Sequence, residues 1–287
     1  MAEMCFLHPK PGPSATADAA THREFYRYPQ YYDVAFGYRD VVAEVDFLLR
    51  CFRHYRNRDP NTVLEIACGV GYHALEFAKR GYAVTALDLQ PEMIAYLRHK
   101  AQSHGVKMDL LIADMRSFEL ARPVELALNL LTSFQHLLTN EDIVAHLRAT
   151  CRNLAPEGLY VLELNHPREY FGGSLLRPIH WTATRGDLEI EAIWGATERG
   201  LDPVAELVEI EAAYHVREGT EKRDLEERGY LRMLLPGELE ALVELAGGFK
   251  LEAFYGDFDL AQPLDASERS WRMIVVLSKQ EDELARE

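Results

Sequence analysis

A glycine turn and several acidic residues lie at the predicted ends of neighbouring strands. Residues 63–72 read VLEIACGVGY, a hydrophobic strand with Glu65 near its tip, followed by a tight turn at Gly69 and Gly71 that leads into a helix. Glycine has no Cβ, so the backbone of such a turn can approach a ligand closely. Asp88 ends the next strand, where a carboxylate can accept hydrogen bonds from both hydroxyls of a ribose. These residues predict a site for a ligand that contains a nucleoside.

The third predicted strand also ends in an acidic residue, in the run Ala113-Asp114-Met115. A carboxylate at this position could accept the exocyclic amine of an adenine, and the apolar neighbour could pack on the ring. Taken alone, Asp114 is more typical of a helix cap or a solvated acid. Its place in the series after Glu65 and Asp88 favours the adenine contact.

The glycine turn is compatible with more than one ligand. Residues 69–74 match the dinucleotide pattern G-x-G-x-x-G/A, so an NAD-dependent oxidoreductase is one alternative. Glu65 counts against it, because a pyrophosphate needs the positive end of a helix and an acidic strand tip repels it. A nucleoside-binding module without catalysis is a further alternative, and so is a turn beside a solvated carboxylate.

Short apolar segments alternate with helical ones from residue 62 onward. The predicted strands are Val63–Ala67, Ala83–Asp88, Met108–Ala113, Leu126–Leu131 and Leu159–Leu164. Helices are expected over Ala74–Lys79, from Pro91 to Gly105, and from Thr139 or Asn140 onward. This alternation indicates an α/β fold with a parallel sheet and helices on both of its faces.

The hydrophobic pattern changes to a period of two between residues 188 and 233. Apolar residues alternate with polar ones around Leu188–Trp194, Val208–Val216 and Arg228–Met233, which predicts a small inserted antiparallel sheet. A last helix starts at Pro236, and a closing pair of strands follows. We therefore expect a flexible segment at 1–24, a core at 25–165 and 235–287, and an insertion at 166–234 that covers the pocket of a second, acceptor molecule.

Composition bears on the partners of the chain. The 287 residues carry a formal charge of −15 without any run of Lys or Arg, which argues against nucleic acid and anionic membranes as partners. No window is apolar enough to span a bilayer. The four cysteines show no CxxC spacing, which favours reduced thiols and a cytoplasmic location. Asp257 and Asp259 are too few for a metal site, so we expect no metal.

Three stretches resemble the successive motifs of class I S-adenosylmethionine-dependent methyltransferases: Val63–Gly71, Ala86–Met93 and Ala113–Met115. The likeness extends over Tyr31–Leu164 and, more loosely, Phe249–Ser278. It is greatest to sugar N-methyltransferases of antibiotic pathways and, more distantly, to glycine N-methyltransferase. The resemblance implies a Rossmann-like sheet of seven strands in the order 3-2-1-4-5-7-6, with the last strand antiparallel and a small antiparallel sheet inserted. It also implies S-adenosylmethionine as the cofactor and S-adenosylhomocysteine as its product.

The resemblance also assigns roles to individual residues of the cofactor site. The implied contacts are Glu65, Gly69, Gly71 and Leu130 to the methionine part, Asp88 to the ribose, and Leu89, Asp114 and Met115 around the adenine. Tyr32 matches a tyrosine of the family's N-terminal lid, although an aromatic residue that only packs between helices fits as well. The chain departs from many relatives in having His73 where some have a third glycine, and Glu65 where Asp is common.

Two histidines are candidates for the acceptor side. The stretch Ser133–Leu137 resembles a Ser-x-x-His-Leu sequence of the sugar enzymes whose histidine faces the acceptor, which makes His136 either a substrate contact or base, or an ordinary polar residue. His166 follows the fifth strand at the ligand-binding edge, but Pro167 makes a structural turn an equal alternative. Methyl transfer from a sulfonium is an in-line displacement that needs alignment more than covalent catalysis. We expect transfer to a nitrogen or oxygen of a small molecule, and a homo-oligomer is compatible with the sequence.

Overall fold

The larger sheet has seven strands in the order β10-β11-β5-β4-β1-β2-β3. The computed structural model describes residues 24–172 and 177–280, apart from the side chains of 197–199. The strands are β1 (Thr62–Ile66), β2 (Ala83–Asp88), β3 (Asp109–Ile112), β4 (Val124–Asn129), β5 (Leu154–Asn165), β10 (Phe249–Tyr255) and β11 (Arg272–Lys279). Strand β11 runs antiparallel to both β5 and β10. The predicted order 3-2-1-4-5-7-6 with an antiparallel last strand is therefore confirmed.

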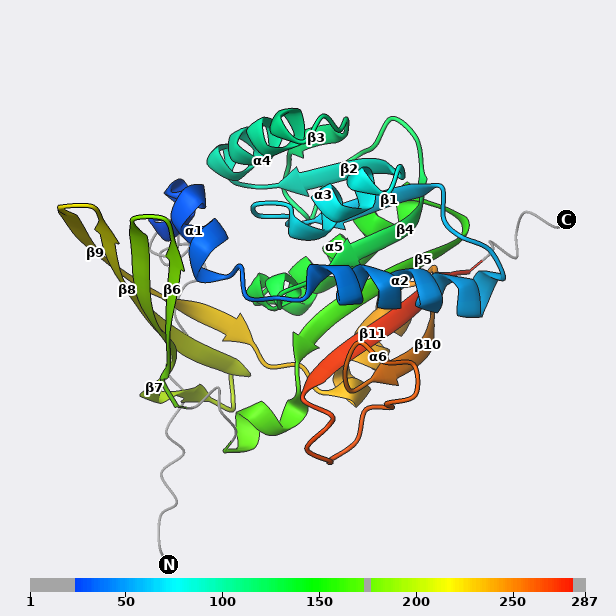
Figure 1. Cartoon of the computed structure of the whole chain (residues 1–287). Coiled ribbons are helices and arrows are strands. Elements are labelled where there is room, and N and C mark those ends of the chain that lie inside the picture. The colour runs from blue at the N-terminus through cyan, green and yellow to red at the C-terminus, as the bar shows by residue number, and fades with distance from the viewer. Residues whose placement is uncertain (1–23, 173–176, 281–287) are drawn as a thin grey trace, which may run out of the picture.

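Helices cover both faces of this sheet (Figure 1). One face carries α2 (Val41–Arg56), α3 (Tyr72–Lys79) and α4 (Pro91–Ser103), and the other carries α5 (Asn140–Asn153) and α6 (Pro236–Ala246). Successive residues of β1 alternate between the two layers: Val63 packs with α2 and α3, whereas Leu64 and Ile66 pack with α5 and α6. Both faces are buried, which explains the nearly continuous apolar runs of these strands.

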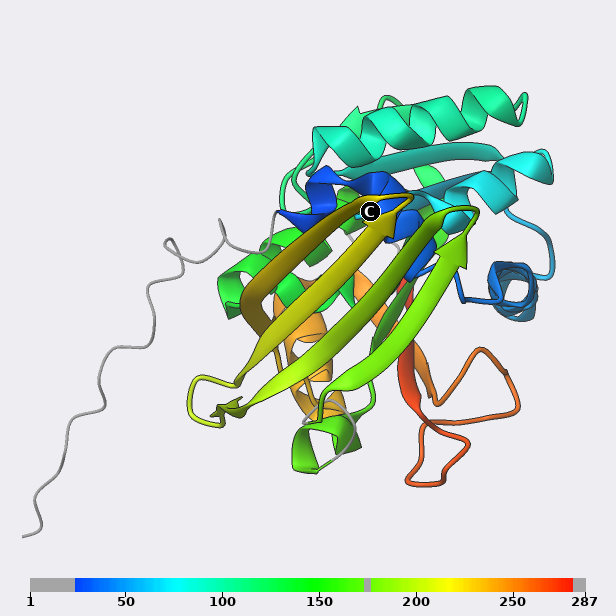
Figure 2. The same ribbon diagram turned by 60° about the vertical axis from the view of Figure 1, so that its left-hand side comes forward.

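A separate sheet of four antiparallel strands follows β5 in the chain. It consists of β6 (Ile179–Arg185), β7 (Leu188–Asp202), β8 (Leu207–Glu218) and β9 (Glu221–Arg232), in that order. Figure 2 shows these four strands side by side, next to the larger sheet and its helices. The sequence pattern indicated three of them and missed β6, an edge strand whose residues are mostly exposed.

A short N-terminal segment lies between the two sheets. It consists of η2 (Phe25–Arg27) and α1 (Pro29–Ala35), and we call it the lid. Figure 1 shows α1 between the smaller sheet and the helices of the larger one. The Phe25 ring stacks on Tyr214 of β8 at 3.6 Å, and Trp181 Nε1 of β6 donates to the Ala35 carbonyl at 2.7 Å. The lid is therefore packed against the inserted sheet and is not a loose arm.

Several predicted strand ends are displaced by one or two residues. Strand β1 stops before Ala67, and β4 stops before Leu131, although both residues were expected inside strands. Ala67 and Leu131 have φ values of 54° and 55°, so the chain already turns there. The expected flexible segment 1–24 lies almost wholly outside the described residues, and the division into core and insertion stays a prediction. No helix in the described ranges is long and apolar enough to cross a membrane.

Gly71 begins α3 in a left-handed conformation with φ of 70°. A Cβ at this position would lie 2.4 Å from Leu97 Cδ1 of α4, and Leu97 is fully buried. Gly71 therefore lets the backbone turn and lets α4 pack close to the start of α3.

Replacing Gly71 by alanine should destabilise the fold for both reasons. Gly81→Ala is the matched control, because Gly81 also has positive φ but a Cβ added there would have nothing within 4 Å. Each variant should lose about 1–2 kcal/mol of unfolding free energy to the left-handed conformation. Gly71→Ala should lose about 1–3 kcal/mol more, because Leu97 must move. Urea unfolding curves measure both losses, and equal losses would show that the contact with Leu97 is unimportant.

Candidate active site

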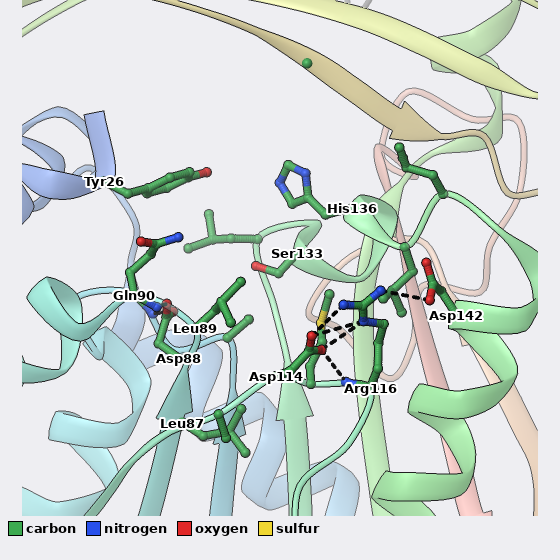
Figure 3. Close-up of a pocket in the computed structure, with 18 of the residues that line it drawn as sticks. Tyr26, Leu87, Asp88, Leu89, Gln90, Asp114, Arg116, Ser133, His136 and Asp142 are labelled. Atoms are coloured by element: carbon green, nitrogen blue, oxygen red, sulfur yellow. Dashed lines mark hydrogen bonds and ion pairs between the residues drawn. The ribbon is translucent and has the colours of Figure 1, made fainter. Parts of the chain in front are cut away.

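A cavity of about 430 Å³ lies at the carboxyl ends of β1, β2 and β3, beneath the lid. This volume is within the usual range for small-molecule sites. Its lining includes seven of the residues predicted from sequence: Tyr32, Gly69, Asp88, Leu89, Asp114, Met115 and His136. Figure 3 shows several of them around the cavity, with Asp88 and Leu89 on one side and Asp114 and His136 on the other.

Asp88 holds the glycine turn against the end of β2. Its Oδ2 accepts a hydrogen bond from Gly69 N at 2.8 Å, and its Oδ1 accepts one from Gln90 N at 2.8 Å. Burial raises the pKa of this carboxyl group, while these backbone N–H groups oppose the increase. A carboxylate has about four acceptor positions. Asp88 can therefore keep both backbone contacts and still accept hydrogen bonds from the cavity.

Asp114 is paired with a cation that no sequence pattern indicated. The Arg116 guanidinium lies 2.6 Å from Asp114 Oδ2 and 3.0 Å from Asp142 Oδ1 of α5, and the dashed lines in Figure 3 mark these contacts. Hydrogen bonds from Arg116 hold the pKa of Asp114 below its ordinary value. Asp114 is thus an ionised acceptor at the wall of the cavity.

Glu65 does not line the cavity, although the resemblance implied a direct contact with the methionine part of the ligand. It is 5% exposed, and Oε2 accepts a hydrogen bond from Ala74 N at 2.7 Å while Oε1 lies 3.2 Å from His73 Nδ1. Ala74 is the third residue of α3, so Glu65 caps this helix. The Glu65 carboxylate puts negative charge beside the start of α3, which counts against the dinucleotide alternative because a pyrophosphate binds at a positive helix N-terminus.

Three more predicted residues also lie outside the cavity lining. Gly71 starts α3, and Leu130 is buried in the core on the α2 side of the sheet. His166 is 5% exposed; its Nε2 donates to the Asp265 carbonyl at 2.9 Å, and its Nδ1 accepts from Arg168 N at 3.1 Å. Both ring nitrogens are thus occupied in a turn, away from the cavity lining.

The remaining wall of the cavity combines aromatic and polar side chains. Figure 3 shows Tyr26 of the lid and His136 of η3 (Ser133–His136) on the side opposite Leu87, with Ser133 nearer the centre. Tyr230 of β9 also lines the cavity. Sequence reasoning assigned no role to Tyr26, which lies in a run of aromatic residues that gives no indication of which ring faces a ligand.

Buried ion pairs support the loop on the acceptor side. Arg39 makes two hydrogen bonds to Glu163 of β5, at 2.9 and 2.8 Å, and Arg272 makes another at 2.6 Å. Burial raises the pKa of Glu163, but the two guanidinium groups outweigh it and hold the pKa below its ordinary value. Glu163 Oε2 also accepts a hydrogen bond from Leu131 N at 2.9 Å, and Leu131 lines the cavity. The ion pairs therefore fix the loop that follows β4.

Comparison with known proteins finds a methyltransferase domain in this chain. A family model described as a methyltransferase domain matches residues 63–158, the part that contains the glycine turn, Asp88 and Asp114. The chain therefore carries a methyltransferase domain. As a methyltransferase it is an enzyme, and S-adenosylmethionine is its methyl donor. No group of three or more potential metal ligands occurs within residues 24–172 and 177–280.

Two curated relatives of this methyltransferase are named for amino sugars. It is 26% identical to dTDP-3-amino-3,4,6-trideoxy-alpha-D-glucopyranose N,N-dimethyltransferase of Streptomyces venezuelae, over 44% of the chain and about half of that relative (51%). It is also 26% identical to dTDP-4-amino-2,3,4,6-tetradeoxy-D-glucose N,N-dimethyltransferase of Saccharopolyspora spinosa, over 73% of the chain and 79% of that relative. The second comparison extends into the inserted sheet.

Solved structures share the fold over most of the methyltransferase. The sugar N-methyltransferase KedS8 from Streptoalloteichus gives a TM-score of 0.71 at 20% identity, covering 98% of this chain and 100% of that one. DesVI from Streptomyces venezuelae gives a TM-score of 0.72 at 21% identity, covering 88% and 98%. The inserted sheet is thus part of a fold that these structures also have.

The contact between His73 and two carboxylates should make stability depend on pH. His73 is fully buried, with Nδ1 near Glu65 and Nε2 2.7 Å from Glu44 Oε2. Burial lowers its pKa, but the hydrogen bonds to Glu44 and Glu65 outweigh burial and raise the pKa to about 9. The unfolded value is about 6.5. The stabilisation is therefore fully present below pH 6.5 and is lost as the pH rises through about 9.

Replacing His73 by glutamine should remove this pH dependence. The unfolding free energy of the wild type should decrease between neutral pH and pH 9, and that of His73→Gln should change less over the same range. Denaturant unfolding at a series of pH values measures both slopes. Parallel slopes for the two proteins would mean that His73 is not protonated in the folded state.

Proposed function

We propose that this methyltransferase transfers a methyl group from S-adenosylmethionine to a nitrogen of a small molecule, and that both bind in the cavity beneath the lid. The observation that carries the proposal is the convergence of the glycine turn, Asp88 and Asp114 on one cavity whose opposite wall is aromatic and polar. The two amino-sugar relatives support nitrogen as the acceptor atom. Oxygen is the second candidate, because His136 could serve as the base that a hydroxyl needs.

The residues present fit an adenosyl group. In this proposal Asp88 accepts hydrogen bonds from the ribose hydroxyls, and Asp114 accepts one from the adenine amine. Leu89, with 48% of its surface exposed, offers an apolar surface for the base between these two carboxylates, together with Met115. Gly69 allows the close approach of the backbone to the methionine part of the cofactor.

The remaining predicted cofactor residues act indirectly in this proposal. Glu65 and Gly71 fix the start of α3, and thereby the shape of the glycine turn. Leu130 is buried in the core on the α2 side of the sheet, and the next residue, Leu131, lines the cavity. Tyr32 covers the glycine turn from the lid, because a Cβ added to Gly69 would lie 3.8 Å from the Cε1 atom of Tyr32.

The chemistry requires alignment and the exclusion of water. When bound, S-adenosylmethionine supplies a methyl group that is already activated by the positive charge on sulfur. In this proposal Tyr26 and Tyr32 close the cavity, and Ser133 and His136 orient the acceptor so that the N–C bond forms in line as the C–S bond breaks. An amine acts as the nucleophile in its uncharged form, and His136 accepts the proton that its nitrogen loses. His166 has no part in this scheme.

A dinucleotide cofactor has less support. The Glu65 carboxylate lies at the start of α3, where a pyrophosphate would need positive charge, and the two amino-sugar relatives are methyltransferases. Their names also favour catalysis over a nucleoside-binding module that only binds. The cytoplasmic location, the homo-oligomer and the absence of nucleic-acid partners stay predictions from the sequence.

Replacing Asp88 by asparagine should weaken cofactor binding. The amide keeps the size of the side chain but presents one acceptor oxygen instead of two, which should cost about 1–3 kcal/mol of binding free energy for S-adenosylhomocysteine. Asp224→Asn is the matched control, because Asp224 is an exposed residue on β9 that pairs with His215. Calorimetric titration measures both affinities. If the Asp88 variant binds as tightly as the control, Asp88 does not hold the ribose.

The choice of acceptor can be tested with paired compounds. Labelled S-adenosylmethionine is incubated with amino sugars and with the same sugars carrying a hydroxyl in place of the amine, and methylated products are identified by mass spectrometry. Methylation of the amines alone is the expected result. Methylation of the hydroxyl compounds alone would contradict the nitrogen assignment, and tight binding of NAD without binding of S-adenosylhomocysteine would contradict the cofactor site.

A further inference from the structure

Asp33 of the lid is a buried carboxylate that two cations share. It is 4% exposed, and its two oxygens lie 2.8 Å from Lys100 Nζ and 2.5 Å from Arg185 Nη1. The Tyr96 hydroxyl donates a third hydrogen bond, at 3.0 Å. Lys100 and Tyr96 belong to α4 of the core, whereas Arg185 is the last residue of β6 in the inserted sheet. One side chain of the lid is therefore bound from both sides.

The backbone of Asp33 is bound by the same neighbours. Its carbonyl accepts hydrogen bonds from Arg185 Nη2 at 2.8 Å and from the Tyr72 hydroxyl of α3 at 3.1 Å. Lys100 Nζ also lies 5.0 Å from the centre of the Tyr72 ring, a cation–π contact. Burial raises the pKa of Asp33, but the hydrogen bonds from Arg185 and Lys100 outweigh it, so the net shift is downward and the carboxylate stays charged.

These contacts fix the neighbouring residue, Tyr32, over the glycine turn. Consecutive residues of a helix point about 100° apart, so Asp33 can bind α4 and β6 while Tyr32 lines the cavity. The Tyr32 ring stacks on Phe36, the residue that follows α1, with 4.5 Å between ring centres, and it lies 5.7 Å from the ring of Tyr26 in the lid. Moving α1 away from the cavity requires separation of both ion pairs of Asp33, since these bind it to elements on opposite sides of the lid.

We propose that Asp33 is a positioning residue for cofactor binding, which fastens the lid to α4 and to β6 so that Tyr32 closes the cavity. Arg185 thereby makes the inserted sheet part of the closure around the cofactor, in addition to any role in covering the acceptor. The inference rests on the proposed cofactor site. It implies that the lid contacts limit how fast the product S-adenosylhomocysteine leaves.

The test uses the dissociation rate of S-adenosylhomocysteine, which needs no knowledge of the acceptor. Asp33→Asn removes the charge without changing the size of the side chain and should speed dissociation about tenfold or more, as expected when a buried ion pair is broken. Arg185→Gln should have a smaller effect of about threefold, since the Arg185 side chain is 56% exposed. Asp59→Asn, which breaks the exposed pair with Arg53, is the control and should change nothing.

A double variant that combines Asp33→Asn with Arg185→Gln shows whether the two residues act through the same contact or independently. Once Asp33 is neutral, Arg185→Gln should have little further effect on dissociation. Thermal unfolding measured beside the rates identifies a merely structural role, which would lower the melting temperature of Asp33→Asn and leave the dissociation rate unchanged. Arg185→Gln alone keeps the test decisive if Asp33→Asn does not fold.

Two failures can be told apart. If both single variants release S-adenosylhomocysteine at the wild-type rate while Asp88→Asn still binds it weakly, the inference on Asp33 is wrong and the proposed cofactor site stands. If the wild-type protein does not bind S-adenosylhomocysteine, the proposed function fails and the inference fails with it.

Discussion

A hydrogen bond of 2.8 Å from Gly69 N to Asp88 Oδ2 joins the glycine turn to the end of β2. The adjacent bond from Cys68 N to the Leu87 carbonyl, at 2.9 Å, continues the pairing of β1 with β2 as far as the turn. Because the carboxyl ends of parallel strands meet at one edge of a sheet, this connection places the glycine backbone and a fixed carboxylate beside each other. The proposed roles of Asp114, Leu89 and the lid all assume that this corner keeps its shape.

The strand pattern allowed a parallel sheet with helices on both faces to be predicted, and with it a site at the carboxyl ends of the strands. The order of the strands was predicted from the family resemblance. The role of Glu65 was harder to predict, although the alternation of β1 contains the necessary signal. Leu64 and Ile66 face the α5 and α6 layer, so Glu65 between them must face α2 and α3, where His73 and Glu44 lie. The family motif shows that this position of the strand is acidic. The alternation of side chains along the strand decides which face of the sheet the acidic side chain points to.

Other parts of the structure depend on contacts between distant segments, which a single sequence does not reveal. Arg39 and Glu163 are 124 residues apart, and Asp33 and Arg185 are 152 apart. The edge strand β6 alternates Ile179, Trp181 and Ala183 with polar residues, so a search for short alternating runs would have found it. No comparable signal distinguishes Tyr26 from the neighbouring aromatic residues of the lid, or marks Arg116 as the partner of Asp142.

The most direct test of the central claim is a crystal structure of the protein with S-adenosylhomocysteine bound. The account predicts that the ribose hydroxyls lie within hydrogen-bond distance of the Asp88 carboxylate while Gly69 N keeps its contact with Oδ2. It also predicts that Tyr32 covers the ligand. A ligand bound elsewhere, or an Asp88 side chain turned away from the ribose, would contradict the account.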